Sequence, residues 1–241
     1  MSDRVLFAVG PYVAVVVFLL GSVIRIAVTG EVAAVAPGPD AARRRRIVAA
    51  CAIALAAGHL VLLGAPEAVL RWNRSLVRLL LAEGVGVGLG SVCLLAVAHA
   101  LWRRLAGSSA RAPSLGDVIA TTLLGLAIGT GLLLAVLYRW ASSWSVVTLT
   151  PYAVSVLTLG PRVEFVAATP FLVRLHVVGT YALLAVLPFT TMGSRVLVPV
   201  QRVVRTVWLP LAPAYGAARA SLAARIRRIV RVPGSLHEEE S

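Results

Sequence analysis

The chain has 241 residues, of which 59% are apolar and only 14% are charged, and its formal net charge is +13. Soluble domains carry about 25% charged residues, so the composition excludes a disordered chain, a collagen-like chain and most soluble domains. All 23 basic residues are arginines. A nucleic-acid-binding protein can be as basic, but it does not carry apolar runs of about twenty residues, so no nucleic-acid partner is expected.

Five stretches approach the length of about 20 apolar residues that a membrane-spanning helix needs. In chain order they cover residues 5–28, 47–64, 79–101, 118–140 and 171–192. The first is too long for a signal peptide and no cleavage pattern follows it, so it is predicted to be a retained span. Gly116-Asp117 resembles the start of the fourth helix, because an acidic residue is favoured at the positive end of the helix dipole.

Proline and glycine mark the segments between these stretches. Residues 141–170, with Pro151, Gly160, Pro161 and Pro170, are predicted to form a long loop. The sequence therefore predicts an all-α integral membrane protein. A five-helix transmembrane bundle occupies residues 1–200, and a basic amphipathic tail occupies residues 201–241, with a helix over about 217–230.

The arginines predict the orientation of this bundle. Fifteen lie on one side, at 43–46, 103, 104, 111 and eight tail positions from 195 to 231, and seven lie on the other, at 4, 71, 74, 78, 139, 162 and 174. Cytoplasmic loops carry an excess of arginine, so the N-terminus is predicted outside and the C-terminus in the cytoplasm. Most of these arginines are expected to contact lipid headgroups.

Cysteine and histidine are the candidate ligands for a metal or cofactor. Cys51 and Cys93 lie inside apolar runs without metal-binding spacing, so both are predicted to be buried core residues. An ionisable residue inside a span is a functional hypothesis, because its burial is costly. His59 and His176 are the two histidines that lie well inside a predicted span. His99 is predicted to lie at the membrane interface, and His237 lies in the polar tail.

His59 lies five residues before the outer end of the second stretch, and His176 lies five residues after the start of the fifth. At a rise of 1.5 Å per residue, both lie about 8 Å below the outer boundary. Two histidines at equal depth on different helices could ligate one haem iron from opposite faces. The alternative is that each histidine is hydrogen-bonded to a neighbouring helix. Arg174 lies near the outer surface, where it could contact a haem propionate.

Several short segments, in their order and spacing, resemble the gamma subunit of respiratory nitrate reductase, a membrane cytochrome b. The resemblance covers about residues 10–205. It is carried by Pro11-Tyr12, residues 17–22 with Arg25, Gly58-His59, Arg103-Arg104, Gly116-Asp117, residues 171–176, Gly179 and Pro188-Phe189. The five spans, the outside N-terminus and the basic tail agree with it.

The resemblance implies the cofactors and the site. The family binds two b-type haems, and the ligands of the outer haem match His59 and His176. The positions of the inner pair are Ala49 and Ser194, which implies one haem b in this chain; His99 lies at about the inner depth and is the alternative ligand for half of a second site. Quinol (menaquinol) oxidation beside the outer haem implies a site at Gly58, His59 and Arg78.

The implied function is electron transfer in the inner (cytoplasmic) membrane of a prokaryotic cell. Electrons would pass from the quinone pool through the haem to an iron–sulfur beta subunit and a molybdenum catalytic alpha subunit. This chain has no motif for nitrate reduction itself. The alternatives are a related cytochrome b serving a heterodisulfide-reductase-like, sulfite-reductase-linked or hydrogenase partner, and a non-redox membrane anchor or transporter.

A single outer haem would lie far from a cytoplasmic partner, because the hydrocarbon core is about 30 Å thick. Three hypotheses follow: the catalytic subunits face outward, the chain serves a different partner, or a companion subunit supplies the inner electron route.

Overall fold

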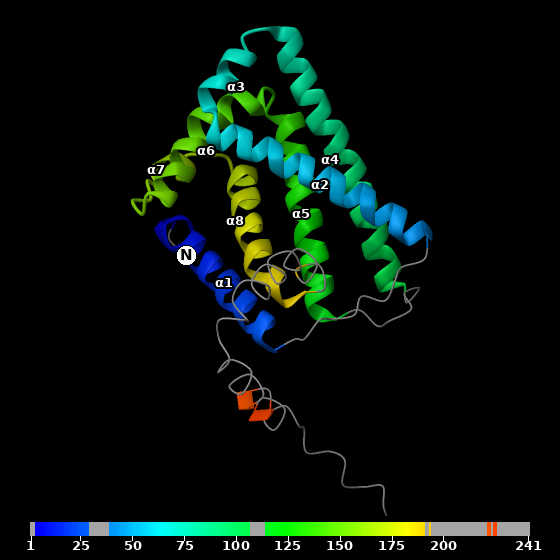
Figure 1. The fold of residues 1–241 in the computed structure, drawn as a ribbon. Helices are drawn as coiled ribbons and strands as arrows, with labels where there is room; N and C mark the ends of the chain where they lie inside the picture. Colours follow the sequence, from blue (N-terminus) through cyan, green and yellow to red (C-terminus); the bar gives the residue numbers. More distant parts are fainter. Residues whose placement is uncertain are drawn as a thin grey trace, which may run out of the picture.

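The computed structural model describes residues 3–28, 39–106 and 114–190, together with residues 193, 221, 222, 224 and 225. This part of the chain is helical and contains no strand (Figure 1). A π-helical turn, η1 (Val5–Val9), leads into α1 (Gly10–Val28), and a 3-10 turn, η2 (Leu187–Phe189), follows the last helix. The helices between them are α2 (Pro39–Gly64), α3 (Pro66–Trp72), α4 (Leu76–Leu105), α5 (Leu115–Leu137), α6 (Ala141–Leu157), α7 (Glu164–Ala167) and α8 (Phe171–Val186).

Within the residues that the structure describes, five helical segments are long and apolar enough to cross a membrane, which confirms the predicted spans. They are Val5–Arg25, Arg46–Gly64, Leu76–Leu105, Leu115–Leu137 and Phe171–Phe189. The helix α2 begins at Pro39, earlier than its apolar stretch, so the arginine run at 43–46 lies in its first turns. The tail at 201–241 lies outside the described residues except for positions 221, 222, 224 and 225.

The prediction of a long loop over residues 141–170 is wrong, because α6 occupies 17 of those residues and α7 follows it. The sequence of α6 is rich in serine, threonine and valine, which are weak helix formers. It also carries Pro151 inside the helix, where a proline removes one backbone hydrogen bond. The local helix propensity of this segment therefore does not predict α6. In the folded protein, α6 forms hydrogen bonds with other helices.

One of these bonds completes the end of α2. The hydroxyl of Thr150 donates to the carbonyl oxygen of Leu62 at 3.1 Å. In a helix that carbonyl would accept from the amide four residues later, but this residue is Pro66, which has no amide hydrogen. The α6 side chain thus supplies the donor that the start of α3 lacks.

A tyrosine network joins α6 to the N-terminal helix and to α8. The hydroxyl of Tyr152, which is only 2% exposed, donates to the carbonyl oxygen of Phe7 at 2.8 Å. The hydroxyl of Tyr181 donates in turn to that of Tyr152 at 3.1 Å. Burial raises the pKa of Tyr152, so the phenol keeps the proton that it donates. The network therefore links α6 to η1 and to α8. The short helices α3 and α7 lie beside α6 at the same end of the bundle (Figure 1).

We expect Tyr152→Phe to destabilise the protein by about 1–3 kcal/mol, because it leaves a buried carbonyl and a buried hydroxyl without their partner. Thermal unfolding in detergent measures this effect as a lower midpoint. Tyr138→Phe is the matched control: this tyrosine is 37% exposed, and surface changes are usually within about 0.5 kcal/mol. Equal midpoints for the two variants would contradict the structural role of the network.

Several residues that carry the family resemblance contact one another at the other end of the bundle. The guanidinium of Arg25 on α1 donates from Nη1 to the carbonyl oxygens of Pro188 and Thr190, at 2.5 and 2.7 Å. One turn earlier, a Cβ added at Gly21 would lie 2.8 Å from the ring of Phe189. These residues therefore form the joint at which α1 meets the end of α8.

The start of α5 also packs against the contact between α1 and the end of α8. The side chain of Ser114 accepts from the amide of Asp117 at 3.1 Å, which caps the helix. A Cβ at Gly116 would lie 3.1 Å from the carbonyl oxygen of Phe189. The predicted helix start at Gly116-Asp117 is thus confirmed, and its glycine permits close approach of η2.

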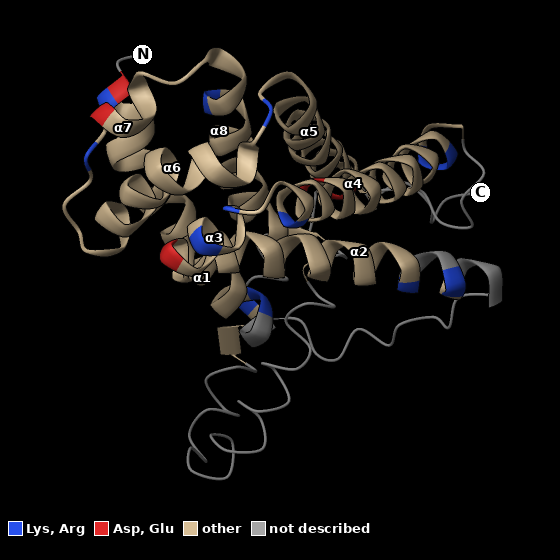
Figure 2. Ribbon diagram, turned by 90° about the horizontal axis from the view of Figure 1, so that it is seen from above, with Lys and Arg blue, Asp and Glu red and all other residues tan. Residues whose placement is uncertain are grey.

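The helices pack unevenly around the middle of the membrane. The central helix α5 packs against α4 and α8, and α1 packs against α8. The main partner of α2 is α4, with further contacts to α6 and α3 at its end. Figure 1 shows α2 crossing in front of α5, and Figure 2, the view from above, shows α2 to one side of α5 and α8. Only 6% of its most apolar window is buried, so most of the surface of α2 is exposed.

Candidate functional site

The structure brings together the two histidines that the sequence paired by depth. The ring centroids of His59 on α2 and His176 on α8 are 6.1 Å apart, and the ring planes are within 23° of parallel. His59 is exposed and His176 is partly buried. Because α2 and α8 are not major packing partners, the two imidazoles meet across the space between the helices.

The hydrogen bond of His59 fixes which ring nitrogen carries the proton. Its Nδ1 lies 2.8 Å from the carbonyl oxygen of Leu55, one turn earlier on α2. A carbonyl only accepts hydrogen bonds, so Nδ1 is protonated and donates. The lone pair of a neutral imidazole is then on Nε2, which is the nitrogen available to a metal.

The same reasoning applies to His176 through a side chain of α5. Its Nδ1 lies 3.0 Å from Oγ1 of Thr130. That hydroxyl has one proton, which it donates to the carbonyl oxygen of Leu126 at 2.7 Å, so its oxygen accepts from Nδ1–H of His176. Metal-ligating histidines typically donate their other ring N–H to an acceptor in this way. In this tautomer, the lone pair of each neutral imidazole is on Nε2, the nitrogen that would bind a metal.

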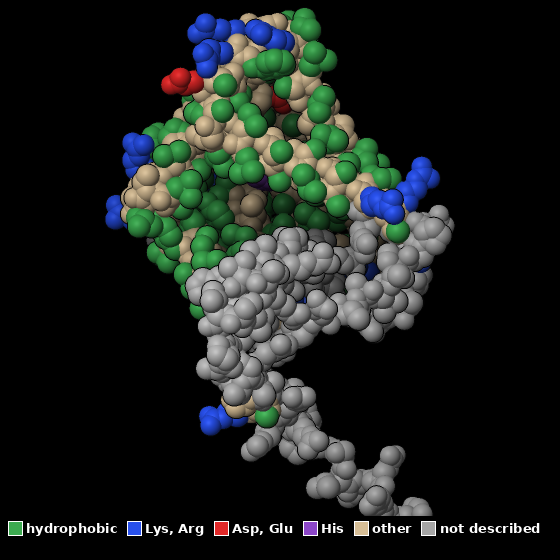
Figure 3. All heavy atoms as spheres, in the orientation of Figure 1, with side chains coloured by type: hydrophobic (Ala, Val, Ile, Leu, Met, Phe, Trp, Pro, Cys, Tyr) green, Lys and Arg blue, Asp and Glu red, His purple; other side chains and the backbone are tan. Residues whose placement is uncertain are grey.

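The spacing and surroundings of the two rings fit a haem. Two metal–nitrogen bonds of about 2 Å, together with the distance from each nitrogen to its ring centre, come to roughly 6 Å, close to the separation here. Figure 3 shows a hollow beneath α2, walled mostly by hydrophobic side chains, with a histidine visible at its upper edge. An added Cβ at Gly58, next to His59, would meet nothing within 4 Å. The residues present thus match the ligand type and the apolar environment of a macrocycle.

Glycine also leaves room for the ring of His176. A Cβ at Gly131 on α5 would lie 3.2 Å from Cε1 of His176 and 3.7 Å from its Nδ1. Sequence reasoning missed both Thr130 and Gly131, because a threonine–glycine pair in an apolar helix has no distinctive pattern. The one usable signal was that both lie in a predicted span, where a threonine needs a hydrogen-bond partner.

Two other predicted site residues lie apart from this pair. Arg174 precedes His176 by two residues, about 200° around the helix, and its Nη1 lies 3.6 Å from a carboxylate oxygen of Asp3. Arg78 lies over the ring of Trp72, with its guanidinium carbon 5.3 Å from the ring centroid. The described contacts join neither arginine to the histidines, so a propionate contact and a quinol contact stay predictions.

The predicted inner haem positions are only partly visible. Ala49 is an exposed residue of α2, and Ser194 lies outside the described residues. His99 is exposed near the end of α4.

Cys51 and Cys93 are free and buried, as predicted. In the described part of the chain, no group of three or more histidine, cysteine or acidic side chains could hold a metal ion.

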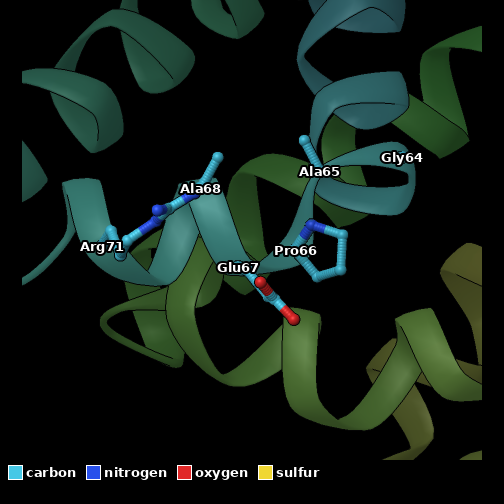
Figure 4. Close-up of a pocket in the computed structure, with 6 residues that line it drawn as sticks. All are labelled: Gly64, Ala65, Pro66, Glu67, Ala68 and Arg71. Atoms are coloured by element: carbon cyan, nitrogen blue, oxygen red, sulfur yellow. The ribbon is translucent and has the colours of Figure 1, made fainter.

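A polar network and a shallow pocket lie near the end of the bundle formed by α3 and α6. Glu83 on α4 accepts from the amide and the hydroxyl of Ser142 at 2.8 and 2.6 Å, and the side-chain amide of Asn73 donates to the same hydroxyl at 3.1 Å. The pocket, of about 320 Å³, lies at the junction of α2 and α3 and is lined by residues 64–68 and Arg71 (Figure 4). Neither feature includes the histidines.

The helical architecture and five apolar helices define a multi-pass membrane protein. The model of the nitrate reductase gamma subunit family matches residues 3–209. The chain therefore belongs to that family, as the resemblance predicted. Comparison with curated proteins gives no significant match. Membership indicates a membrane cytochrome b-type subunit that associates with other nitrate reductase subunits.

Proposed function

We propose that this chain holds one haem b between His59 and His176 and carries electrons from quinol toward the catalytic subunits of a nitrate reductase-type complex. The observation that carries the proposal is the ring pair itself: two imidazoles 6.1 Å apart, each with Nδ1 hydrogen-bonded to an acceptor. Membership of the gamma subunit family supports it.

The haem supplies one-electron transfer when it is bound, and the protein sets its position and environment. His59 on α2 and His176 on α8 are the residues that would ligate the iron. The carbonyl of Leu55 and the hydroxyl of Thr130 orient the two rings, and the apolar helices exclude water from the site. Ala49 offers no metal ligand, so a single haem is proposed.

The proposed quinol site lies at the outer end of α2. Gly58 leaves open space beside His59, and Arg78 supplies a basic group near the start of α4. Oxidation of a quinol such as menaquinol releases two electrons and two protons. With the N-terminus outside, as the arginine distribution predicts, the protons would leave on the outer side. The proposed acceptors are the iron–sulfur beta and molybdenum alpha subunits.

The haem count of the purified chain tests the proposal. We expect one haem per chain by pyridine haemochrome, a b-type band in the reduced-minus-oxidised spectrum, and reduction of that band by a menaquinol analogue. The absence of haem would contradict the proposed function. Two haems per chain would contradict the loss of the inner site at Ala49 and Ser194, and a haem that quinol does not reduce would contradict the quinol site.

A further inference from the structure

We propose that Thr130 is a positioning residue that sets the reduction potential of the haem held by His176. Its hydroxyl accepts the Nδ1–H of His176, which fixes the ring and raises the basicity of the ligating nitrogen. This inference rests on the proposed function, because it concerns a residue that acts on the iron only through His176.

The contact is specific in direction and well buried. Thr130 is 4% exposed, and its Oγ1 lies 3.0 Å from Nδ1 of His176. Threonine in a helix commonly donates to the carbonyl one turn earlier, and Thr130 does so to Leu126 at 2.7 Å. When this proton is donated within α5, to Leu126 or Ala127, the hydroxyl oxygen is the acceptor for Nδ1–H of His176 on α8.

The two histidines differ in how their second nitrogen is held. His59 donates to a backbone carbonyl of its own helix, which no side-chain substitution removes. His176 donates to a side chain of another helix, so its environment depends on residue 130 and on the packing of α5 against α8. Thr130 is therefore the residue whose substitution would change the surroundings of His176 independently of those of His59.

The expected sign follows from the charge on the iron. An acceptor at Nδ1 makes the imidazole a better electron donor, which favours the more positive, ferric state. Removing the acceptor should favour the ferrous state. Mutation of such outer contacts typically costs about 10–100-fold in metal affinity or activity, and we expect a change of about tenfold in the ferrous-to-ferric ratio. A tenfold change in the ferrous-to-ferric ratio of a one-electron couple corresponds to about 59 mV.

Redox titration of the haem band in the full-length protein tests the proposal. Thr130→Val keeps the shape but loses the acceptor, and it should shift the ratio about tenfold toward the ferrous form. Thr130→Ser keeps a hydroxyl and should restore the wild-type potential. Thr180→Val is the matched control, because the hydroxyl of Thr180 donates to the backbone carbonyl of His176 at 2.8 Å and does not touch its ring.

The outcomes separate this inference from the proposed function. Haem at wild-type content with equal potentials in Thr130→Val and Thr130→Ser would overturn the role of Thr130 and leave haem binding intact. An equal shift in Thr180→Val would also overturn it. If Thr130→Val retains no haem, Thr130→Ala supplies the measurement, and the same upward shift is expected. A wild-type chain without haem would overturn both proposals.

Discussion

Replacement of His176 by alanine is expected to abolish haem binding to the chain, whereas replacement of His99 by alanine should leave it unchanged. His176 is one of two imidazoles whose ring centroids lie 6.1 Å apart. Removing it leaves His59 as a single ligand on an exposed helix. His99, which is exposed near the opposite end of α4, is the matched control for the general effect of losing a histidine. Pyridine haemochrome analysis of both variants measures the haem content.

His59→Ala should have the same effect as His176→Ala, because the proposed site needs a ligand from each helix. A full haem signal in either variant would refute the assignment of that residue. Loss of half the signal in His99→Ala would indicate that a second haem is present and that His99 contributes to it. Circular dichroism of each variant checks that helix content is retained, so that haem loss reports on the ligand rather than on folding.

The spans were predictable because the bilayer imposes a length and a composition on every crossing helix. The sequence could not reveal α6 in the same way. Its residues are weak helix formers around Pro151, and its stability depends on bonds to residues far away in the chain, such as Leu62 and Phe7. Tertiary contacts of this kind override local propensity.

The pairing of His59 with His176 was predictable from depth, since helices of known direction place residues at calculable heights. The supporting residues were not. Thr130 and Gly131 act on His176 from a third helix, and only the packing of α5 against α8 reveals which face of α5 turns toward the imidazole. Their role therefore depends on helix rotation, which an apolar span with residues of similar polarity on all sides leaves undetermined.

The residues that carry the family resemblance fall into two groups in the structure. Gly58, His59 and the 171–176 segment carry the candidate site, whereas Arg25, Gly116 and Pro188-Phe189 meet at the joint between α1, α5 and the end of α8. The joint fixes where α8 ends, and the site lies some three turns earlier on that helix. The resemblance thus identifies both the metal ligands of the proposed site and the packing that sets the position of one of them.

Gly131→Ala is expected to weaken haem binding by about tenfold, the lower end of the range for outer-shell changes. The new Cβ would lie 3.2 Å from Cε1 of His176, which is closer than ordinary contact, so the ring must move by a few tenths of an ångström. That movement would also lengthen the hydrogen bond to Thr130. The measurements are haem content after purification and the position of the reduced haem band.

Gly129→Ala provides a matched control on the same helix, because its added Cβ would meet only Leu94, at an ordinary 3.9 Å. Alanine in place of glycine favours a helix by about 1 kcal/mol, so both variants gain the same local stability. The difference between them therefore isolates the contact with the imidazole. Equal haem content and equal spectra in the two variants would show that the ring of His176 is not held against α5, and would contradict the geometry on which the site rests.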